Sequence, residues 1–223
     1  MQRLSNEQFS SLHQNAVVIE ADHYGEKVLK LVDGSFLKLF RRKRLISSAT
    51  LISHASRFAA NVIKLKQRGI VCPEIIATYR ISGIERTAVH YWPLPGDTLR
   101  HLLEQPSDSH ASLAYSLGAL IAELHSKGVY FRSLHLGNVI QHEQSELGLI
   151  DISDMTCSDA ALGRFRRSRN FRHLFRYKWD VNRLNAYRTR FIDGYVEHLP
   201  ERYAAYFRKK LGMLFDQHTQ EPS

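Results

Sequence analysis

Residues 128–151 read GVYFRSLHLGNVIQHEQSELGLID, and the rest of the chain can be interpreted outward from this stretch. A helix-like segment ends before Gly128, a short loop ends at Gly137 and Asn138, and a second apolar run leads to Asp151. Asn138 and Asp151 offer an amide and a carboxylate oxygen, which are the hard ligands that Mg²⁺ prefers. The stretch therefore reads as a polar loop that ends at Asn138, followed by an apolar strand that ends at an acid.

Three short segments near the start of the chain are rich in branched or aromatic residues and are separated by glycine-containing breaks. They span residues 16–20, 27–32 and 35–40. They predict antiparallel strands, and Asp33-Gly34 is a strong hairpin signal because glycine accepts the positive φ of a tight turn. Lys38 stands in the middle of the third strand. Simple alternation would point it to solvent, whereas a lysine facing a cleft would meet phosphate oxygens.

A helix is predicted over residues 47–68 from the helical spacing of apolar side chains, with Ser47 or Ser48 as its cap and Gly69 after its end. No acidic residue occurs between positions 47 and 69. Two more strands are predicted after this helix, and a glycine-containing turn joins them. They span residues 74–81 and 86–91.

The character of the chain changes from strands to helices in residues 92–99, WPLPGDTL. We therefore expect an α+β protein of two lobes, with an antiparallel sheet and one helix in residues 1–91 and a mainly helical lobe in residues 92–223. Ligands favour such junctions. Helices in the second lobe are predicted over residues 99–104, capped by Thr98, over residues 112–126, and after Pro200.

Composition narrows the range of partners and compartments. The chain has 31 Lys and Arg against 22 Asp and Glu, a formal net charge of +9, which favours anionic partners. Cys72 and Cys157 are isolated and give no disulfide or metal pattern. The sequence shows neither an apolar core of signal-peptide type nor a run of about 18 apolar residues. We expect a cytoplasmic protein that is able to touch the inner-membrane surface.

A strongly basic stretch follows Asp151. From Arg164 to Arg190 the chain carries ten Lys and Arg residues and one acid, Asp180. Aromatic residues lie between them, as on a nucleic-acid surface. Apolar side chains nevertheless recur at helical spacing, so we expect most of them in the core and the arginines on one solvated or anion-facing side. The recurring positions are residues 171, 174, 175, 184, 187, 191 and 195.

This order of elements, together with Leu134-His135-Leu136-Gly137-Asn138 and Leu149-Ile150-Asp151, resembles the protein-kinase-like fold. It is most similar to the bacterial lipopolysaccharide core kinases, the Kdo and heptose kinase family, over residues 15–195. The segment DGSFLKLFRRKR, residues 33–44, and the arginine-rich stretch also resemble the toluene-tolerance proteins, a group linked to the cell envelope.

The resemblance implies a site for ATP and Mg²⁺. Lys38 stands where such kinases place the lysine that touches the α- and β-phosphates. Asn138 and Asp151 match the two metal ligands, and Tyr91 and Trp92 fall in the hinge that receives adenine.

Two further positions belong to the expected nucleotide and catalytic region. Gly25 is the one glycine in residues 21–26, a break that would lie over the phosphates, although no GxGxxG is present. Arg132 matches the arginine that precedes the catalytic acid of the kinases.

The sequence departs from the kinase pattern at three places. The position of the catalytic aspartate is Ser133, and serine is no general base at neutral pH. The helix over residues 47–68 lacks the glutamate that would pair with Lys38, and Phe58 and Asn61 are nearest in register. Asp151 is followed by Ile152 and Ser153, so the metal ligand is kept without the expected glycine.

His135 or Asp154 could stand in for the missing base, but each has a simpler structural interpretation. His135 matches a histidine found in relatives that already possess the aspartate, and Asp154 is placed to cap a turn.

Two functions therefore remain open. One is an ATP-dependent kinase that acts on an anionic glycolipid or phosphorylated sugar of the lipopolysaccharide core. The other is a pseudokinase, a scaffold or nucleotide-binding regulator of cell-envelope synthesis. A nucleic-acid-binding module has no support beyond charge, and pairs such as His101 and His110 lack the spacing of a zinc site.

Overall fold

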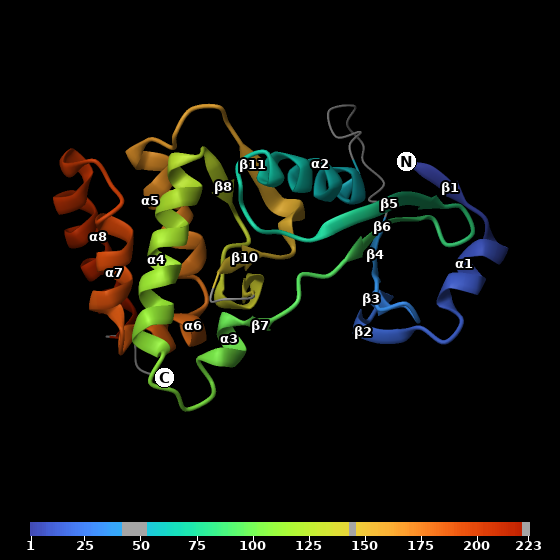
Figure 1. Cartoon of the computed structure of the whole chain (residues 1–223), viewed down its shortest axis with the longest axis horizontal. Helices are drawn as coiled ribbons and strands as arrows, with labels where there is room; N and C mark the ends of the chain where they lie inside the picture. Colours follow the sequence, from blue (N-terminus) through green and yellow to red (C-terminus); the bar gives the residue numbers. More distant parts are fainter. Residues whose placement is uncertain (42–52, 143–145, 220–223) are drawn as a thin grey trace. The chain divides into compact units, whose positions relative to one another are not determined.

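The computed structural model describes residues 1–41, 53–142 and 146–219. The chain divides into two compact units. The first unit contains Met1–Leu94 together with Asp151–Asp154, and the second contains Pro95–Ile150 and Met155–Ser223. The first unit is built on a sheet and the second is mainly helical, which confirms the predicted α+β class (Figure 1). The first compact unit runs to Leu94 and also includes Asp151–Asp154. The division of the chain into two lobes at residues 91 and 92 stays a prediction.

The first unit contains a six-stranded sheet in the order β1-β5-β6-β4-β3-β2. β1 runs parallel to β5, and the other neighbours are antiparallel. The five predicted strands are all present, and their ends differ from the prediction by at most two residues. The strands are β1 (Gln2–Leu4), β2 (Val17–Asp22), β3 (Gly25–Lys30), β4 (Phe36–Arg41), β5 (Glu74–Ile81) and β6 (Arg86–Trp92).

The hairpin between β3 and β4 forms as the Asp33-Gly34 signal predicts. Gly34 has φ +88°, a conformation that glycine adopts without steric cost. The Asp33 carboxylate accepts the Ser35 backbone N–H at 2.9 Å, so the turn is fixed by its own side chain. This turn sets the register that pairs Lys38 with Val28 on one side and with Val89 of β6 on the other.

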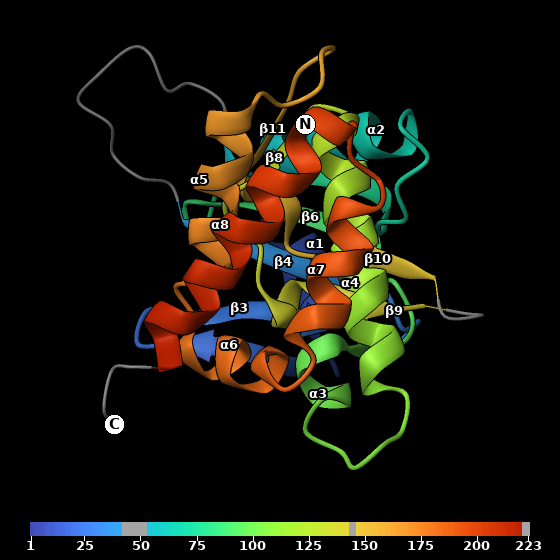
Figure 2. The same ribbon diagram turned by 90° about the vertical axis from the view of Figure 1, so that its left-hand side faces the viewer.

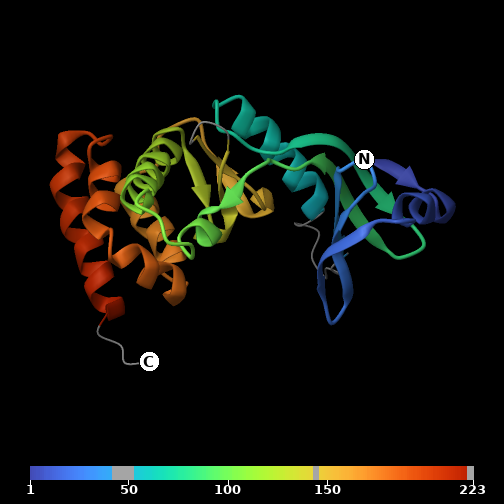
Figure 3. The same ribbon diagram turned by 60° about the horizontal axis from the view of Figure 1, so that its bottom comes forward.

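The sequence prediction missed an N-terminal strand and helix, β1 and α1 (Asn6–His13). A local signal for the helix exists, because Ser5 and Gln8 form a capping box in which each side chain bonds the other residue's backbone N–H. Phe9 and Leu12 of α1 pack against the core cluster that includes Leu4 and Leu29. The N-terminal segment thus extends the sheet, with α1 beside β1 (Figure 3).

The helix between β4 and β5 is α2 (His54–Lys66), and it begins later than predicted. Ser53 is its N-cap, because the Ser53 side chain accepts the Ser56 backbone N–H at 3.1 Å. The predicted caps, Ser47 and Ser48, and the basic cluster of residues 42–44 lie outside the described residues. α2 buries its apolar stripe, including Phe58 and Val62, and contacts the 3₁₀ turn η4 (Ile152–Asp154).

The helices of the second unit bury the apolar positions predicted for the core, apart from a partly exposed Tyr187. Thr98 caps the first helix as predicted, but that helix ends at Leu102 rather than at position 104, since Leu103 already forms its C-cap. No helix within the described residues is long and apolar enough to cross a membrane. The helices are α3 (Leu99–Leu102), α4 (His110–Ser126), α5 (Arg164–Leu174), α6 (Lys178–Asn185), α7 (Arg188–Val196) and α8 (Glu201–Thr219).

Helices α4 and α7 lie side by side (Figure 2) and approach each other closely through two glycines. A Cβ on Gly118 would lie 2.2 Å from the Phe191 carbonyl oxygen, and one on Gly194 would lie 2.0 Å from the Tyr115 carbonyl oxygen. Backbone therefore packs directly against backbone at this crossing.

Short strands frame residues 128–150 of the second unit. β8 pairs with β11, and β9 pairs with both β7 and β10. The 3₁₀ turn η2 lies between β8 and β9 and carries Asn138. The elements are β7 (Asp97–Thr98), β8 (Val129–Phe131), η2 (Leu136–Asn138), β9 (Val139–Gln141), β10 (Leu147–Leu149) and β11 (Met155–Cys157).

Candidate functional site

Lys38 and Asp151 form an ion pair within the first unit. Strand β4 points Leu37 and Leu39 into the core, so Lys38 lies on the opposite face of the sheet. Its Nζ lies 2.8 Å from Oδ1 of Asp151, and its side chain is only 14% exposed. The alternation of the strand therefore directs this lysine to an acidic partner rather than to open solvent.

Asp151 adopts a left-handed backbone conformation with φ +49°. This region is uncommon for a residue with a Cβ and costs on the order of 1 kcal/mol or more. The residues on both sides of it are fastened. The Ile150 N–H donates to the Asn138 carbonyl at 3.0 Å, and the Ile152 carbonyl accepts the Asn61 side-chain amide at 2.7 Å. These bonds hold the strained conformation that presents the Asp151 carboxylate to Lys38.

Asn61 is one of the two α2 residues, with Phe58, that are nearest in register to the glutamate expected from the resemblance to kinases. It is buried on α2, and its amide bonds the backbone of η4 instead of Lys38. The lysine thus pairs directly with Asp151. The sequence identified Asn61 only as a missing glutamate, and the contact with Ile152 could not be read from local spacing.

The two predicted adenine-binding residues differ in their surroundings. Tyr91 is buried, and its ring contacts Phe36 and Phe58 at centroid distances of 5.9 and 5.3 Å. Burial, and secondarily the negative charge of Asp151, raise the pKa of the Tyr91 hydroxyl well above its usual range. Trp92 ends β6 and is largely exposed. Tyr91 is therefore a core residue near the ion pair, and contact of either residue with adenine stays a prediction.

Gly25 begins β3 directly after a tight turn. Asp22 pairs with Gly25 across the hairpin, and the Asp22 carboxylate accepts the Tyr24 N–H at 2.8 Å. Arg86 reaches across from β6 and donates to the carbonyl oxygens of Tyr24 and Glu26. The break is a short, braced hairpin, and a contact of Gly25 with phosphates stays a prediction.

The second unit holds the catalytic-loop-like residues in a compact turn. The Asn138 side-chain amide donates to the Ser133 carbonyl at 2.8 Å, and its backbone N–H donates to the His135 carbonyl at 2.9 Å. Ser133 is partly buried and Arg132 is exposed. The buried Asn138 is therefore oriented by the backbone carbonyl of Ser133, the residue that the resemblance to kinases aligns with the catalytic aspartate.

His135 makes contacts that suit a residue that fixes the loop. Its Nδ1 accepts the Gly137 N–H at 3.1 Å and lies 3.4 Å from a guanidinium nitrogen of Arg100. Its ring packs on Tyr177 at a centroid distance of 4.5 Å. These contacts favour the structural interpretation of His135, while its role as a substitute base stays a prediction.

Asp180 is the positioning residue that the sequence did not reveal. Its carboxylate is fully buried and accepts two bonds from Arg100, at 2.8 and 3.0 Å, and one from the Leu136 N–H at 2.9 Å. The bonds to Asp180 raise the pKa of Arg100. The sequence does hold a signal for its burial, because Asp180 lies on the apolar face of α6 together with Val181 and Leu184. Asp180 ties α6 and α3 to the loop that carries Asn138.

The side-chain oxygens of Asp151 and Asn138 are of the kind that binds Mg²⁺. Within the described part of the chain no group of three or more His, Cys, Asp or Glu side chains gathers as a metal cage. Mg²⁺ bound to a nucleotide needs only one or two carboxylates beside the phosphates and water. Asp151 offers such a carboxylate and Asn138 an amide oxygen; that they share one ion stays a prediction.

Comparison with known proteins gives a likeness of fold only. The chain matches no protein-family model and no curated protein sequence. It is similar to a solved structure of a divergent kinase from Toxoplasma, described as lacking the glycine-rich loop and as regulating membrane ultrastructure of the parasitophorous vacuole. The two are 15% identical with a TM-score of 0.40, and the match covers 85% of this chain and 64% of that one. A likeness of this degree transfers no residue role to this chain.

Proposed function

We propose that this chain is a kinase-like protein that binds Mg-ATP and phosphorylates an anionic sugar of the lipopolysaccharide core. The observation that carries the proposal is the ion pair of Lys38 with Asp151. This ion pair places a lysine, which is able to bind phosphate, beside an aspartate, which is able to bind a metal ion. The strands and the helix around them follow the order expected from the resemblance to kinases. The strained backbone of Asp151 adds support, because such strain concentrates at functional sites.

Each residue has a defined task in this proposal. Lys38 would exchange its bond to Asp151 for bonds to phosphate oxygens, and Asp151 and Asn138 would hold the metal ion. Mg²⁺, when bound, neutralises charge on the phosphate oxygens. Asp180 and Asn138 keep the loop around Ser133 in one conformation, so that the acceptor hydroxyl meets a fixed backbone. Ser133 supplies no general base, so we expect transfer slower by about 10² to 10⁴ than with an aspartate.

The acceptor class rests on the resemblance to lipopolysaccharide core kinases and on charge. A net charge of +9 and the basic helices α5 and α6 suit a phosphorylated glycan or the surface of an anionic membrane.

The second candidate function is a pseudokinase that regulates cell-envelope synthesis. The observation that favours it is the occupation of both catalytic positions by residues of another type. Ser133 stands at the position expected for the catalytic aspartate. Asn61, near the position expected for the helix glutamate, donates its side-chain amide to the Ile152 carbonyl. Among the described residues Lys38 pairs with the carboxylate of Asp151 instead of a helix glutamate, an arrangement compatible with nucleotide binding without transfer.

A binding assay tests the part that both functions share. We expect ATP to raise the melting temperature of the wild type only with Mg²⁺ present, and the Asp151→Ala variant to lose that response. Asp108→Ala is the matched control, because Asp108 is an exposed acid in a turn. Absence of a magnesium-dependent response in the wild type contradicts nucleotide binding.

A transfer assay separates the two functions. Labelled ATP is supplied with lipopolysaccharide core oligosaccharide to the wild type and to Ser133→Asp. Label transfer by the wild type supports the kinase and excludes the scaffold. If only Ser133→Asp transfers label, the native protein is a pseudokinase.

A further inference from the structure

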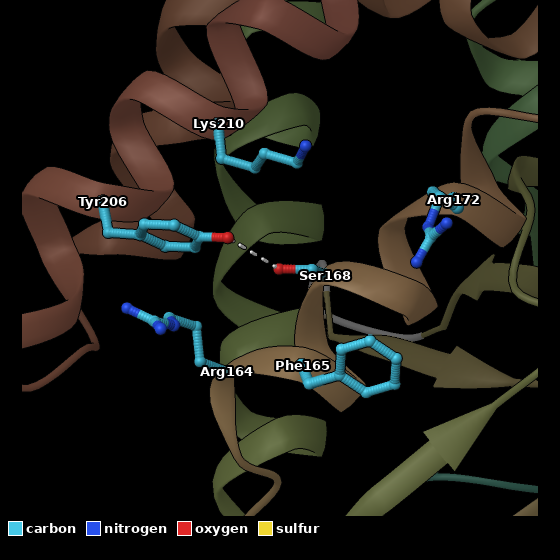
Figure 4. Close-up of a pocket in the computed structure, with 6 residues that line it drawn as sticks. All are labelled: Arg164, Phe165, Ser168, Arg172, Tyr206 and Lys210. Atoms are coloured by element: carbon cyan, nitrogen blue, oxygen red, sulfur yellow. Dashed lines mark hydrogen bonds between the residues drawn. The ribbon is translucent and has the colours of Figure 1, made fainter.

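A second candidate site lies in the helical unit, between α5 and α8. A pocket of about 380 Å³ opens there, and its lining includes none of Lys38, Asn138 and Asp151. Figure 4 shows Tyr206 and Lys210 of α8 reaching toward Ser168 and Arg172 of α5. Its volume falls within the usual range for small-ligand pockets. Its lining residues are Arg164, Phe165, Ser168, Arg172, Tyr206 and Lys210.

The lining carries positive charge that this region does not neutralise. Three of the six residues are cations, and no acid occurs in the sequence between Asp159 and Asp180 or between Glu201 and Asp216. Within the described residues no carboxylate forms an ion pair with Arg164, Arg172 or Lys210. Clustered cations repel one another, so a bound anion would stabilise this arrangement.

Hydroxyl groups lie among these cations. The Ser168 hydroxyl, on a buried residue, lies 3.4 Å from the Tyr206 hydroxyl, and both are able to donate to an anion. The Arg164 guanidinium lies over the Tyr206 ring at 5.0 Å, which holds that ring beside the pocket. Phe165 is 71% exposed and adds an apolar edge.

We propose that this α5–α8 pocket binds the phosphomonoester group of a small ligand, either a soluble sugar phosphate or a lipid headgroup. Arginine matches a tetrahedral phosphate through paired N–H donors, lysine adds a compact charge, and the two hydroxyls complete the donor set. The proposal goes beyond nucleotide binding, since it involves none of the residues assigned to ATP or Mg²⁺.

Calorimetry of the full chain in magnesium-free buffer with EDTA tests the pocket. Inorganic phosphate and glucose 6-phosphate are titrated against chloride and glucose at matched ionic strength. We expect saturable binding of both phosphates. We expect Arg172→Ala/Lys210→Ala to weaken it at least about tenfold, because two charge-assisted contacts are lost.

The matched control removes two charges from the same helices outside the pocket. Arg176 follows α5 and Lys209 precedes Lys210, and both are exposed. We expect Arg176→Ala/Lys209→Ala to change the affinity less than about twofold, because neither residue lines the pocket and salt weakens interactions between exposed charges. Both double variants should keep the wild-type melting temperature and circular dichroism. Equal losses in the two double variants, or no saturable phosphate binding, would overturn the proposal.

Two further arms identify the source of the phosphate and separate this site from the nucleotide site. Binding to vesicles that contain phosphatidic acid, but not to phosphatidylcholine vesicles, would assign the pocket to a lipid headgroup if Arg172→Ala/Lys210→Ala abolishes it. Binding of glucose 6-phosphate without binding to the phosphatidic acid vesicles would assign the pocket to a soluble phosphate ester. Phosphate binding should persist in Asp151→Ala, and its loss there would move the binding to the nucleotide site and overturn the proposal.

Discussion

Lys38 and Asp151 meet at 2.8 Å although the aspartate has to adopt φ +49° to make the contact. An exposed ion pair contributes less than about 1 kcal/mol, and Asp151 is 41% exposed, so the pair alone offers little to offset the backbone strain. The conformation is held by the bonds on either side of Asp151, from Asn61 to Ile152 and from Ile150 to Asn138. Strain maintained by the surrounding fold is what a preorganised site requires.

The backbone strain at Asp151 can be measured by comparing two substitutions that both remove the carboxylate. At an ordinary position alanine is more stable than glycine by roughly 0.4 to 1 kcal/mol. At φ +49° the Cβ is unfavourable, so we expect Asp151→Gly to be more stable than Asp151→Ala by about 1 kcal/mol. Urea unfolding of the two variants gives the difference. A more stable alanine variant would show that the left-handed conformation is not populated.

The positions of five strands along the chain could be predicted from the sequence because each of these strands and the turns between them carry a local signal. Asp33-Gly34 and the alternation around Lys38 predict the β3–β4 hairpin and its register. The same signals show that Lys38 faces away from the core-facing leucines, but not that it meets Asp151. The resemblance to kinases assigned Lys38 to phosphate and Asp151 to the metal ion, and it did not predict the ion pair that the two side chains form.

Contacts between distant segments escaped the prediction. Asp180 looked like a lone acid in a basic stretch, yet it bonds Arg100 and the Leu136 backbone. Such contacts depend on how helices pack, which the period of one helix does not report. The capping box at Ser5 and Gln8 was different, since its signal was local and was overlooked.

The buried carboxylate of Asp180 should stabilise the second unit strongly. Asp180→Ala would leave the Leu136 N–H and the Arg100 guanidinium without this acceptor. Because Arg100 is partly exposed and can regain water, we expect a loss of about 2 to 4 kcal/mol, below the upper range for fully buried pairs. Urea unfolding measures the loss, and hydrogen exchange at Leu136 should accelerate.

An exposed ion pair provides the comparison for Asp180. Arg188 and Asp216 pair at 2.8 Å with both side chains about half exposed, so Arg188→Ala should cost less than about 1 kcal/mol. Similar losses for Asp180→Ala and Arg188→Ala would mean that Asp180 does not anchor the loop.

The crossing of α4 and α7 should tolerate no methyl group. Gly194→Ala would place Cβ 2.0 Å from the Tyr115 carbonyl oxygen, so the helices must move apart. We expect a loss of about 2 to 4 kcal/mol in the free energy of unfolding. Gly212→Ala in α8 is the control, because among the described residues no heavy atom outside its chain neighbours and its own helix backbone lies within 4 Å of the added Cβ. Helix propensity predicts a gain of up to about 1 kcal/mol for this variant. Thermal unfolding that leaves Gly194→Ala as stable as the wild type would refute the close crossing.

A buried histidine should make the second unit sensitive to acid. His125 is fully buried, its Nε2 donates to the Asn170 side-chain oxygen at 3.1 Å, and its Nδ1 accepts the Tyr195 hydroxyl at 2.9 Å. Burial, and then the charge of Arg167, lower the pKa of His125 from 6.5 to about 3. In the folded state the His125 imidazole thus stays neutral at pH values, below about 6.5, at which it is protonated in the unfolded chain.

The sign of the pH effect follows from the lowered pKa of His125. Its contribution to stability is complete above pH 6.5 and is lost as the pH falls toward 3, at up to about 1.4 kcal/mol per pH unit. Urea unfolding at pH 7, 6 and 5 measures the slope. We expect His125→Gln to be less stable at pH 7 but to lose less stability on acidification than the wild type, because the buried imidazole no longer titrates. Parallel slopes for His125→Gln and the wild type would show that other groups govern the acid response, since removing a histidine that stays neutral in the fold must flatten the curve.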